Sequence, residues 1–165
     1  MTLLPRRSLA FLLIGLAVPT IVRAQAQPGP GSMTIDSLNA VVTGMGYDTK
    51  PDGSGKHFTI PVHSNYNYIV DFFVSADGST VWLSVNLASF NAEQLTRLQA
   101  VNLLEASDAG PANFTLSKGT ETDTLYVQRG LPSRAVNPVN IRLTIDNLVK
   151  LGNDTDAIWN KSLWK

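Results

Sequence analysis

The chain contains no cysteine. Disulfide bonds, thiolate metal ligands, thiol nucleophiles and a lipid-anchored cysteine are therefore excluded. Histidine is scarce as well, with only His57 and His63. Six positions along a single strand would separate them by about 20 Å, too far to share a metal ion. We expect both to be ordinary loop and edge residues, and we predict no metal site.

A basic cluster is also missing. The chain has thirteen acidic and thirteen basic residues, and three of the basic ones lie before residue 27. The remainder has ten basic residues against thirteen acidic ones, a net charge of −3. This weak negative charge without a basic run argues against nucleic acid or anionic lipid as the main partner.

No apolar run is long enough for a membrane helix. The apolar run Leu9–Val18 is broken by Pro19, and even the longer stretch Ser8–Val22 has only fifteen residues, whereas a membrane-spanning helix needs about 20. The run follows a basic pair, Arg6-Arg7, and precedes small residues, which is the layout of a cleavable secretory signal. We therefore predict no stable membrane insertion after cleavage.

The predicted signal peptide covers residues 1–26. Cleavage after Ala26 or after Ala24 satisfies the small-residue rule, and Ala26 completes an A-x-A site. The arginine pair is compatible with either general secretory or twin-arginine export. The mature protein is expected to be periplasmic or secreted, with a Pro/Gly linker at residues 27–32 and a single domain at 33–165.

Motifs for catalysis and cofactor binding are absent. The stretch "GSGKH" lacks the first glycine and the Ser/Thr of a phosphate-binding loop. No serine lies in a G-x-S-x-G elbow, and "DGSG" and "NDTD" lack calcium-loop spacing. We predict no catalytic residue and no cofactor, and therefore not an enzyme.

Hydrophobic periodicity predicts an α+β fold in the order α-β-β-β-α-β-β-α. Helices are expected at 33–47, 89–107 and 137–152, and strands at 57–62, on both sides of residue 77, and in the 112–131 hairpin. Asn91 with Gln94 forms a capping box for the second helix, and Asn137 with Pro138 opens the third. Gly152 is expected to end or kink that helix.

We expect an antiparallel sheet of about five strands with helices packed on one face. Two sets of side chains are expected to be buried: Leu95, Leu98, Val101 and Leu104 of the second helix, and Ile158, Trp159 and Leu163 near the C-terminus.

The stretch "YIVDFFVSADGSTVWLSV" predicts a hairpin with a two-residue turn at Asp77-Gly78, in which both turn residues have positive φ. Counting outward pairs apolar residues on one face: Val74 with Val81, Phe72 with Leu83, Val70 with Val85, and Tyr68 with Leu87. The other face then pairs Phe73 with Trp82, Asp71 with Ser84, and Ile69 with Asn86. This register is self-consistent, because a slip of one residue would mix the two faces.

The second face, here called the outer face, places four large side chains among hydroxyl and amide groups: Ile69, Phe73, Trp82 and Tyr126. Aromatic residues within a polar rim are typical of interfaces. Three interpretations remain open. The face binds a partner or a second copy, a helix or the C-terminal Trp159/Trp164 segment covers it, or the aromatic pair only strengthens the hairpin.

Most of the mature sequence resembles the YbjN-domain proteins, which share the layout of type III secretion chaperones. The resemblance lies in "SLNAVVTGMGY", in "YIVDFF…TVWLSV", and in "LTRLQAVNLLEAS" leading into "ANFTLS". It continues in "TLYVQRGLPSRAVNPVNIRLTIDNLV" and ends with "AIWNKSLW". The chain departs from the family where it reads Leu104-Glu105-Ala106 and in its predicted signal peptide. The resemblance implies a non-enzymatic fold that uses its surfaces for dimerisation and protein binding, and it transfers no functional residue.

Together these observations favour an exported, non-catalytic protein-binding or chaperone-like module with a protein partner or a homodimer. The alternative is a small glycan- or ligand-binding envelope protein, or a hydrolase, that uses the same aromatic face. Catalysis requires a carboxylate pair or a histidine-centred site in a cleft, and the hairpin register places only Asp71 on that face.

Overall fold

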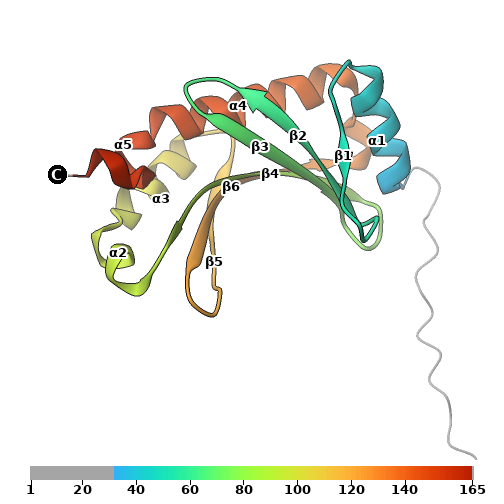
Figure 1. Ribbon diagram of the computed structural model, residues 1–165. Helices are drawn as coiled ribbons and strands as arrows, with labels where there is room; N and C mark the ends of the chain where they lie inside the picture. Colours follow the sequence, from blue (N-terminus) through green and yellow to red (C-terminus); the bar gives the residue numbers. More distant parts are fainter. Residues whose placement is uncertain (1–31, 165) are drawn as a thin grey trace, which may run out of the picture.

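The computed structural model describes residues 32–164, which form one antiparallel sheet with helices on one side (Figure 1). The predicted α+β class is confirmed, but the sheet has six strands where five were expected. The extra strand is β1 (Lys50–Pro51), a two-residue edge strand paired with β2 (His57–His63). The predicted signal peptide, residues 1–26, lies outside the described residues.

The remaining elements follow in chain order. They are α1 (Ile35–Gly44), β3 (Asn67–Val74), β4 (Thr80–Phe90), α2 (Ala92–Arg97), α3 (Ala100–Ala109), β5 (Asn113–Ser117), β6 (Asp123–Pro132), the 3-10 turn η1 (Ser133–Ala135), α4 (Pro138–Asp154), α5 (Asp156–Trp159) and η2 (Lys161–Leu163). The spatial order of the strands is β1-β2-β3-β4-β6-β5, so β6 lies between β4 and β5.

The hairpin of β3 and β4 has the predicted register. Val70 faces Val85, Phe72 faces Leu83 and Phe73 faces Trp82. The ladder ends at Val70–Val85, and the register of β4 against β6 shifts between Asn86 and Ala88. The two outermost predicted pairs, Tyr68–Leu87 and Ile69–Asn86, are therefore not part of the ladder.

The turn of this hairpin differs from the prediction. The Gly78 N–H donates to the Ser75 carbonyl at 2.8 Å, so Ala76 and Asp77 occupy the middle of the turn. Gly78 has φ +70°, but no non-glycine residue of 32–164, Asp77 included, has positive φ. The Asp77 carboxylate accepts from the Ser75 and Ser79 hydroxyls and stabilises a right-handed turn instead. The predicted turn type is wrong, and the register survives because the turn still joins Ser75 to Thr80.

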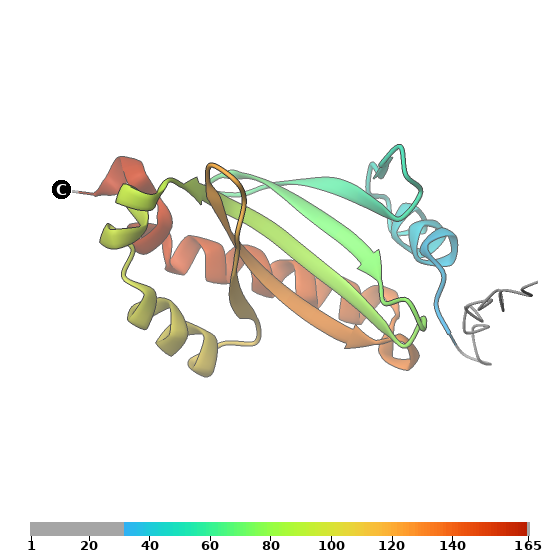
Figure 2. The same cartoon turned by 90° about the horizontal axis from the view of Figure 1, so that it is seen from below.

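The core lies between the sheet and α4. Helix α4 begins at the predicted cap, since the Asn137 side chain accepts from the Asn140 N–H and Pro138 occupies the first turn. Its buried side chains recur at helical spacing and face the sheet: Ile141, Thr144, Ile145, Leu148, Val149 and Leu151. Figure 2 shows α4 behind the strands when the sheet is viewed from its other side. One sheet face is thus covered, while no helix of residues 32–164 covers the central strands on the other (Figures 1 and 2).

The second predicted helix is two helices. The Asn91–Gln94 capping box opens α2 as predicted, but Leu98 is extended (φ −67°, ψ 122°) and α3 begins two residues later. Leu103 is buried, whereas Val101 and Leu104, both predicted to be buried, are 65% and 66% exposed. The prediction is wrong because the break resets the helical phase, so counting across it selects the wrong face.

The C-terminal part closes one end of the core. Helix α4 continues through Gly152 to Asp154, and α5 follows after Thr155, so Gly152 does not end the helix. The Trp159 indole is buried and donates to the Gly152 carbonyl at 2.8 Å. Of the three side chains predicted to pack here, Leu163 is exposed.

Candidate functional site

The sheet brings the four predicted residues onto one face, the outer face. The Phe73 and Trp82 rings lie nearly parallel, with centroids 6.2 Å apart and an interplanar angle of 11°. Ile69 lies two residues before Asp71 on β3, so the two side chains share a face of the strand. Ile69 is 49% exposed. Tyr126 of β6 lies opposite Asn86 of β4 on one side and Thr115 of β5 on the other.

The C-terminal tryptophans do not cover this pair. Trp159 packs edge-to-face on Tyr66, with centroids 5.2 Å apart, and Trp164 stacks on Phe90. Phe90 is itself fully buried. The interpretation in which the Trp159/Trp164 segment covers the outer face is therefore wrong.

Trp82 lies against the backbone of β6. A Cβ atom placed on Gly130 would lie 3.3 Å from two atoms of the indole and 3.2 Å from the Thr80 methyl group. Beside the indole is an open pocket of about 440 Å³. Its lining comes from strands and from the segment before β5, and from no helix: Thr80, Trp82, Pro111, Ala112, Asn113, Arg129, Gly130 and Pro132.

His57 adds a polar cluster next to the aromatic pair. It faces Phe73 across β2 and β3, and its Nδ1 lies 2.9 Å from the Asp71 carboxylate. Its Nε2 lies 3.0 Å from the carboxylate of Asp52 in the β1–β2 connection. The sequence pattern of either strand alone does not predict this cluster, because it depends on the cross-strand register of β2 and β3. That register would have placed His57 and Asp71 as diagonal neighbours.

Hydrogen bonds set the charges in this cluster. The Ser54 hydroxyl, followed by the N–H groups of His57, Ser54 and Lys56, lowers the pKa of Asp52 to about 2. The hydrogen bond to Asp71, together with the negative charges of Asp71 and Asp52, raises the pKa of His57 above its ordinary value of 6.5. The carboxylates of Asp52 and Asp71 therefore both bind the His57 imidazole. None of these three residues lines either of the two pockets described here. We call Asp52, His57 and Asp71 the His57 clasp, because their contacts join the β1–β2 connection to strands β2 and β3.

Within residues 32–164, no group of three or more histidine and acidic side chains is placed to hold a metal ion. His63 lies away from His57 and its Nδ1 contacts the Asn67 side chain at 2.7 Å. In the same part of the chain, no helix combines the length and apolarity needed to cross a membrane.

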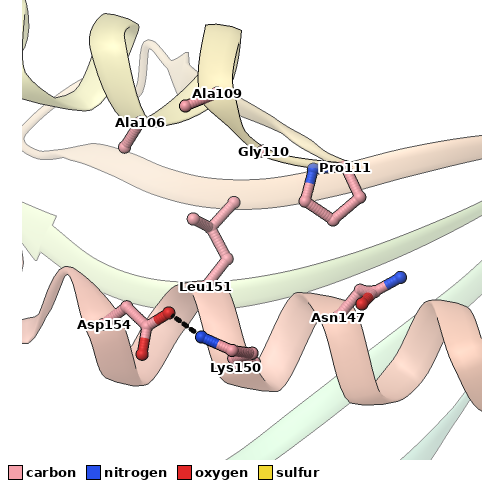
Figure 3. Close-up of a pocket in the computed structure, with 8 residues that line it drawn as sticks. All are labelled: Ala106, Ala109, Gly110, Pro111, Asn147, Lys150, Leu151 and Asp154. Carbon is pink, nitrogen blue, oxygen red and sulfur yellow. Dashed lines mark hydrogen bonds and ion pairs between the residues drawn. The ribbon is translucent and has the colours of Figure 1, made fainter.

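A second pocket, of about 360 Å³, lies between α3 and α4 (Figure 3). Helix α4 contributes Leu151 and the ion pair of Lys150 with Asp154, and the end of α3 contributes alanines and Gly110. Its polar groups are already paired with each other, apart from the Asn147 amide at the rim. We regard the outer face as the better candidate, because it combines the exposed side chain of Ile69 with the stacked rings of Phe73 and Trp82.

The sequence matches no family model and no curated protein sequence. Solved structures do share its fold. YbjN from E. coli superposes with a TM-score of 0.57 at 11% identity, covering 76% of this chain and 92% of YbjN. A chain of the ExsC–ExsE complex superposes with a TM-score of 0.51 at 12% identity, covering 78% of this chain and 96% of that one. The chain therefore shares the fold of YbjN and of the ExsC–ExsE chain, as the resemblance to YbjN-domain proteins predicted.

Proposed function

We propose that this chain is an exported, non-catalytic protein-binding domain, periplasmic or secreted, that binds a partner protein or a second copy of itself through the outer face. The observation that carries the proposal is the stacked Phe73–Trp82 pair, which lies on the face of β3 and β4 opposite the buried Phe72 and Leu83. Large aromatic rings left partly in water forgo burial free energy that a partner would recover. The polar side chains around them suit the rim of an interface.

Two further observations support this function. One of the structures with this fold is a complex between two proteins, ExsC and ExsE. The N-terminal pattern of a basic pair, an apolar run and an A-x-A site supports export. The His57 cluster does not favour catalysis, because its two carboxylates are engaged with one imidazole and lie outside the two pockets.

The test is a variant that changes the outer face without disturbing the core. Ile69→Ser removes an apolar side chain that is 49% exposed, so it should cost less than about 1 kcal/mol of folding free energy. We expect it to reduce capture of partners from a cell-envelope extract, or to shift a dimer to monomer in sedimentation velocity. Leu143→Ser, at a 55% exposed position on α4, is the matched control.

Equal capture and unchanged sedimentation for the Ile69 variant would overturn the proposal. The same would follow if the Leu143 variant were the one that lost binding, since it lies on the opposite side of the sheet. A drop in the melting temperature of the Ile69 variant would show that the side chain belongs to the core.

A second candidate, binding of an envelope glycan, is favoured by the amide and hydroxyl groups that surround the aromatic pair. Asn86 is exposed, and the Gln128 amide donates to the Thr115 hydroxyl on the same face. Protease treatment of the extract separates the candidates. Capture of a protein is lost after digestion, whereas capture of a glycan persists.

A further inference from the structure

The pocket beside Trp82 lies where the sheet changes width. Strand β5 pairs with β6 only as far as Asn113–Gln128, whereas β4 continues to pair with β6 as far as Thr80–Pro132. From Arg129 onward β6 is therefore the edge of the sheet. The pocket occupies the place where β5 would have continued, between this edge and Pro111.

The backbone at this edge is available for pairing. The Ser133 N–H donates to the Ser79 carbonyl at 2.8 Å, which makes Ser79 and Ser133 a hydrogen-bonded pair. Because such pairs alternate in an antiparallel ladder, Trp82 and Gly130 form a pair without hydrogen bonds between them. The N–H and C=O of Gly130 consequently point away from β4, toward the side on which β5 has ended.

The pocket is lined by one positively charged residue, Arg129, and by no negatively charged one. Arg129 is half-buried, and none of the eight lining residues is acidic. Among residues 32–164, no carboxylate or hydrogen-bond acceptor engages the Arg129 side chain. A partly desolvated guanidinium gains most from a carboxylate, which it can bind through two parallel hydrogen bonds. The Asn113 amide lies at the same pocket and can donate another.

We propose that this pocket binds an extended internal segment of a partner protein through an aspartate or glutamate side chain. The carboxylate contacts Arg129, whose side chain lies on the sheet face opposite Trp82 because Arg129 pairs with the buried Leu83. The segment's backbone pairs with Gly130, and the adjacent side chain of the segment, which points to the other face, is apolar and packs on Trp82. An internal segment fits better than a chain end, because Gly130 offers both a donor and an acceptor and a continuing strand uses both. This inference rests on the proposed function and specifies the chemistry of the partner.

The probe is a heptapeptide of alternating threonine and valine with glutamate at its centre, acetylated and amidated so that it has no terminal charges. Titration into the mature protein is followed by the NMR shifts of the Gly130 amide and the Trp82 indole N–H. We expect both signals to move. Replacing the central glutamate by glutamine, or making Arg129→Gln, should weaken binding about tenfold, the size expected for one charge-assisted contact. Arg142→Gln, at an exposed position on α4, is the matched control and should bind normally.

Three results would overturn the inference: equal binding of the glutamate and glutamine peptides, normal binding by the Arg129 variant, or no shift with any peptide. Preference for a glutamine peptide with a free C-terminal carboxylate would assign the pocket to chain ends instead, which also contradicts it. The proposed function is tested separately. If Ile69→Ser loses partner capture while Arg129→Gln retains it, the outer face binds a partner and only the pocket assignment fails.

Discussion

His57 joins three segments of the chain at one side chain. Its imidazole contacts Asp52 of the β1–β2 connection and Asp71 of β3, while its own strand, β2, lies between them. The Asp52 carboxylate also accepts from the N–H groups of Ser54 and Lys56, so it orders the loop that leads into β2. The clasp thus holds the β1–β2 connection against the edge of the outer face.

This clasp predicts a dependence of stability on pH. The pKa of His57 is raised in the folded protein, so its protonated form is favoured by folding. The stabilisation is complete below the ordinary pKa of 6.5 and is lost as the pH rises through the raised value. We therefore expect His57→Gln to lower the free energy of unfolding more at about pH 5.5 than at about pH 9. Urea denaturation at both values measures the difference.

The control for this experiment is His63→Gln, because that imidazole contacts the Asn67 side chain and no carboxylate. An equal loss of stability at both pH values for the His57 variant would contradict the clasp. Both side chains of the His57–Asp71 pair are about 40% exposed, so solvent screening keeps the effect small.

At the scale of elements, the break between α2 and α3 decides which side chains reach the core. Helix α2 ends when Leu98 becomes extended, and the first turn of α3 has no side-chain cap at Gln99. The helix is then held by its own buried residue, Leu103, and by the Ser107 hydroxyl, which accepts from the Phe114 N–H at the start of β5. As a result, the side chains of Val101 and Leu104 point toward solvent.

Two neighbouring leucines test this assignment directly. Leu103 is 4% exposed and Leu104 is 66% exposed. We expect Leu103→Ala to lower the free energy of unfolding by about 2–4 kcal/mol through the cavity it leaves. Leu104→Ala should change it by less than about 0.5 kcal/mol. Chemical denaturation of the two variants gives the comparison, and equal losses would contradict the helix phase seen here.

At the scale of the whole molecule, the C-terminal segment closes the core by returning to the β2–β3 connection. Tyr66 of that connection packs on Trp159, and its hydroxyl donates to the Asp156 carboxylate at 2.8 Å. The Asn160 amide donates to the same hydroxyl at 3.1 Å. These contacts join residues about 90 positions apart, so they stabilise the complete fold and no single element.

Trp159→Ala should therefore destabilise the whole domain. Removing a buried indole typically costs about 3–5 kcal/mol, and here its hydrogen bond to the Gly152 carbonyl is lost as well. Thermal unfolding should show one cooperative transition at a much lower temperature. Leu163→Ala, at a 48% exposed position nearby, is the control. An unchanged midpoint of thermal unfolding, with changes confined to the residues at the C-terminus, would mean that this end unfolds independently of the domain.

Features that depend on neighbouring residues could be predicted from the sequence. The caps of α2 and α4 and the pairing of Phe73 with Trp82 each follow from residues within one helix or one hairpin. The hairpin register was predictable even though its turn type was not, because alternation along two adjacent strands admits one solution. The α+β class followed from the order of the elements.

Contacts between segments distant in the chain were decided by the tertiary structure alone. No local sequence pattern indicates that β6 lies between β4 and β5. This strand order places Gly130 against the Trp82 indole and leaves Arg129 at an open edge of the sheet. The clasp of His57 likewise depends on how the β1–β2 connection folds back. Local hydrogen bonding and periodicity act over a few residues, whereas strand order and helix phase result from packing the entire core. The sequence by itself thus determined the fold class, the helix caps and the aromatic pair, and packing determined what surrounds that pair.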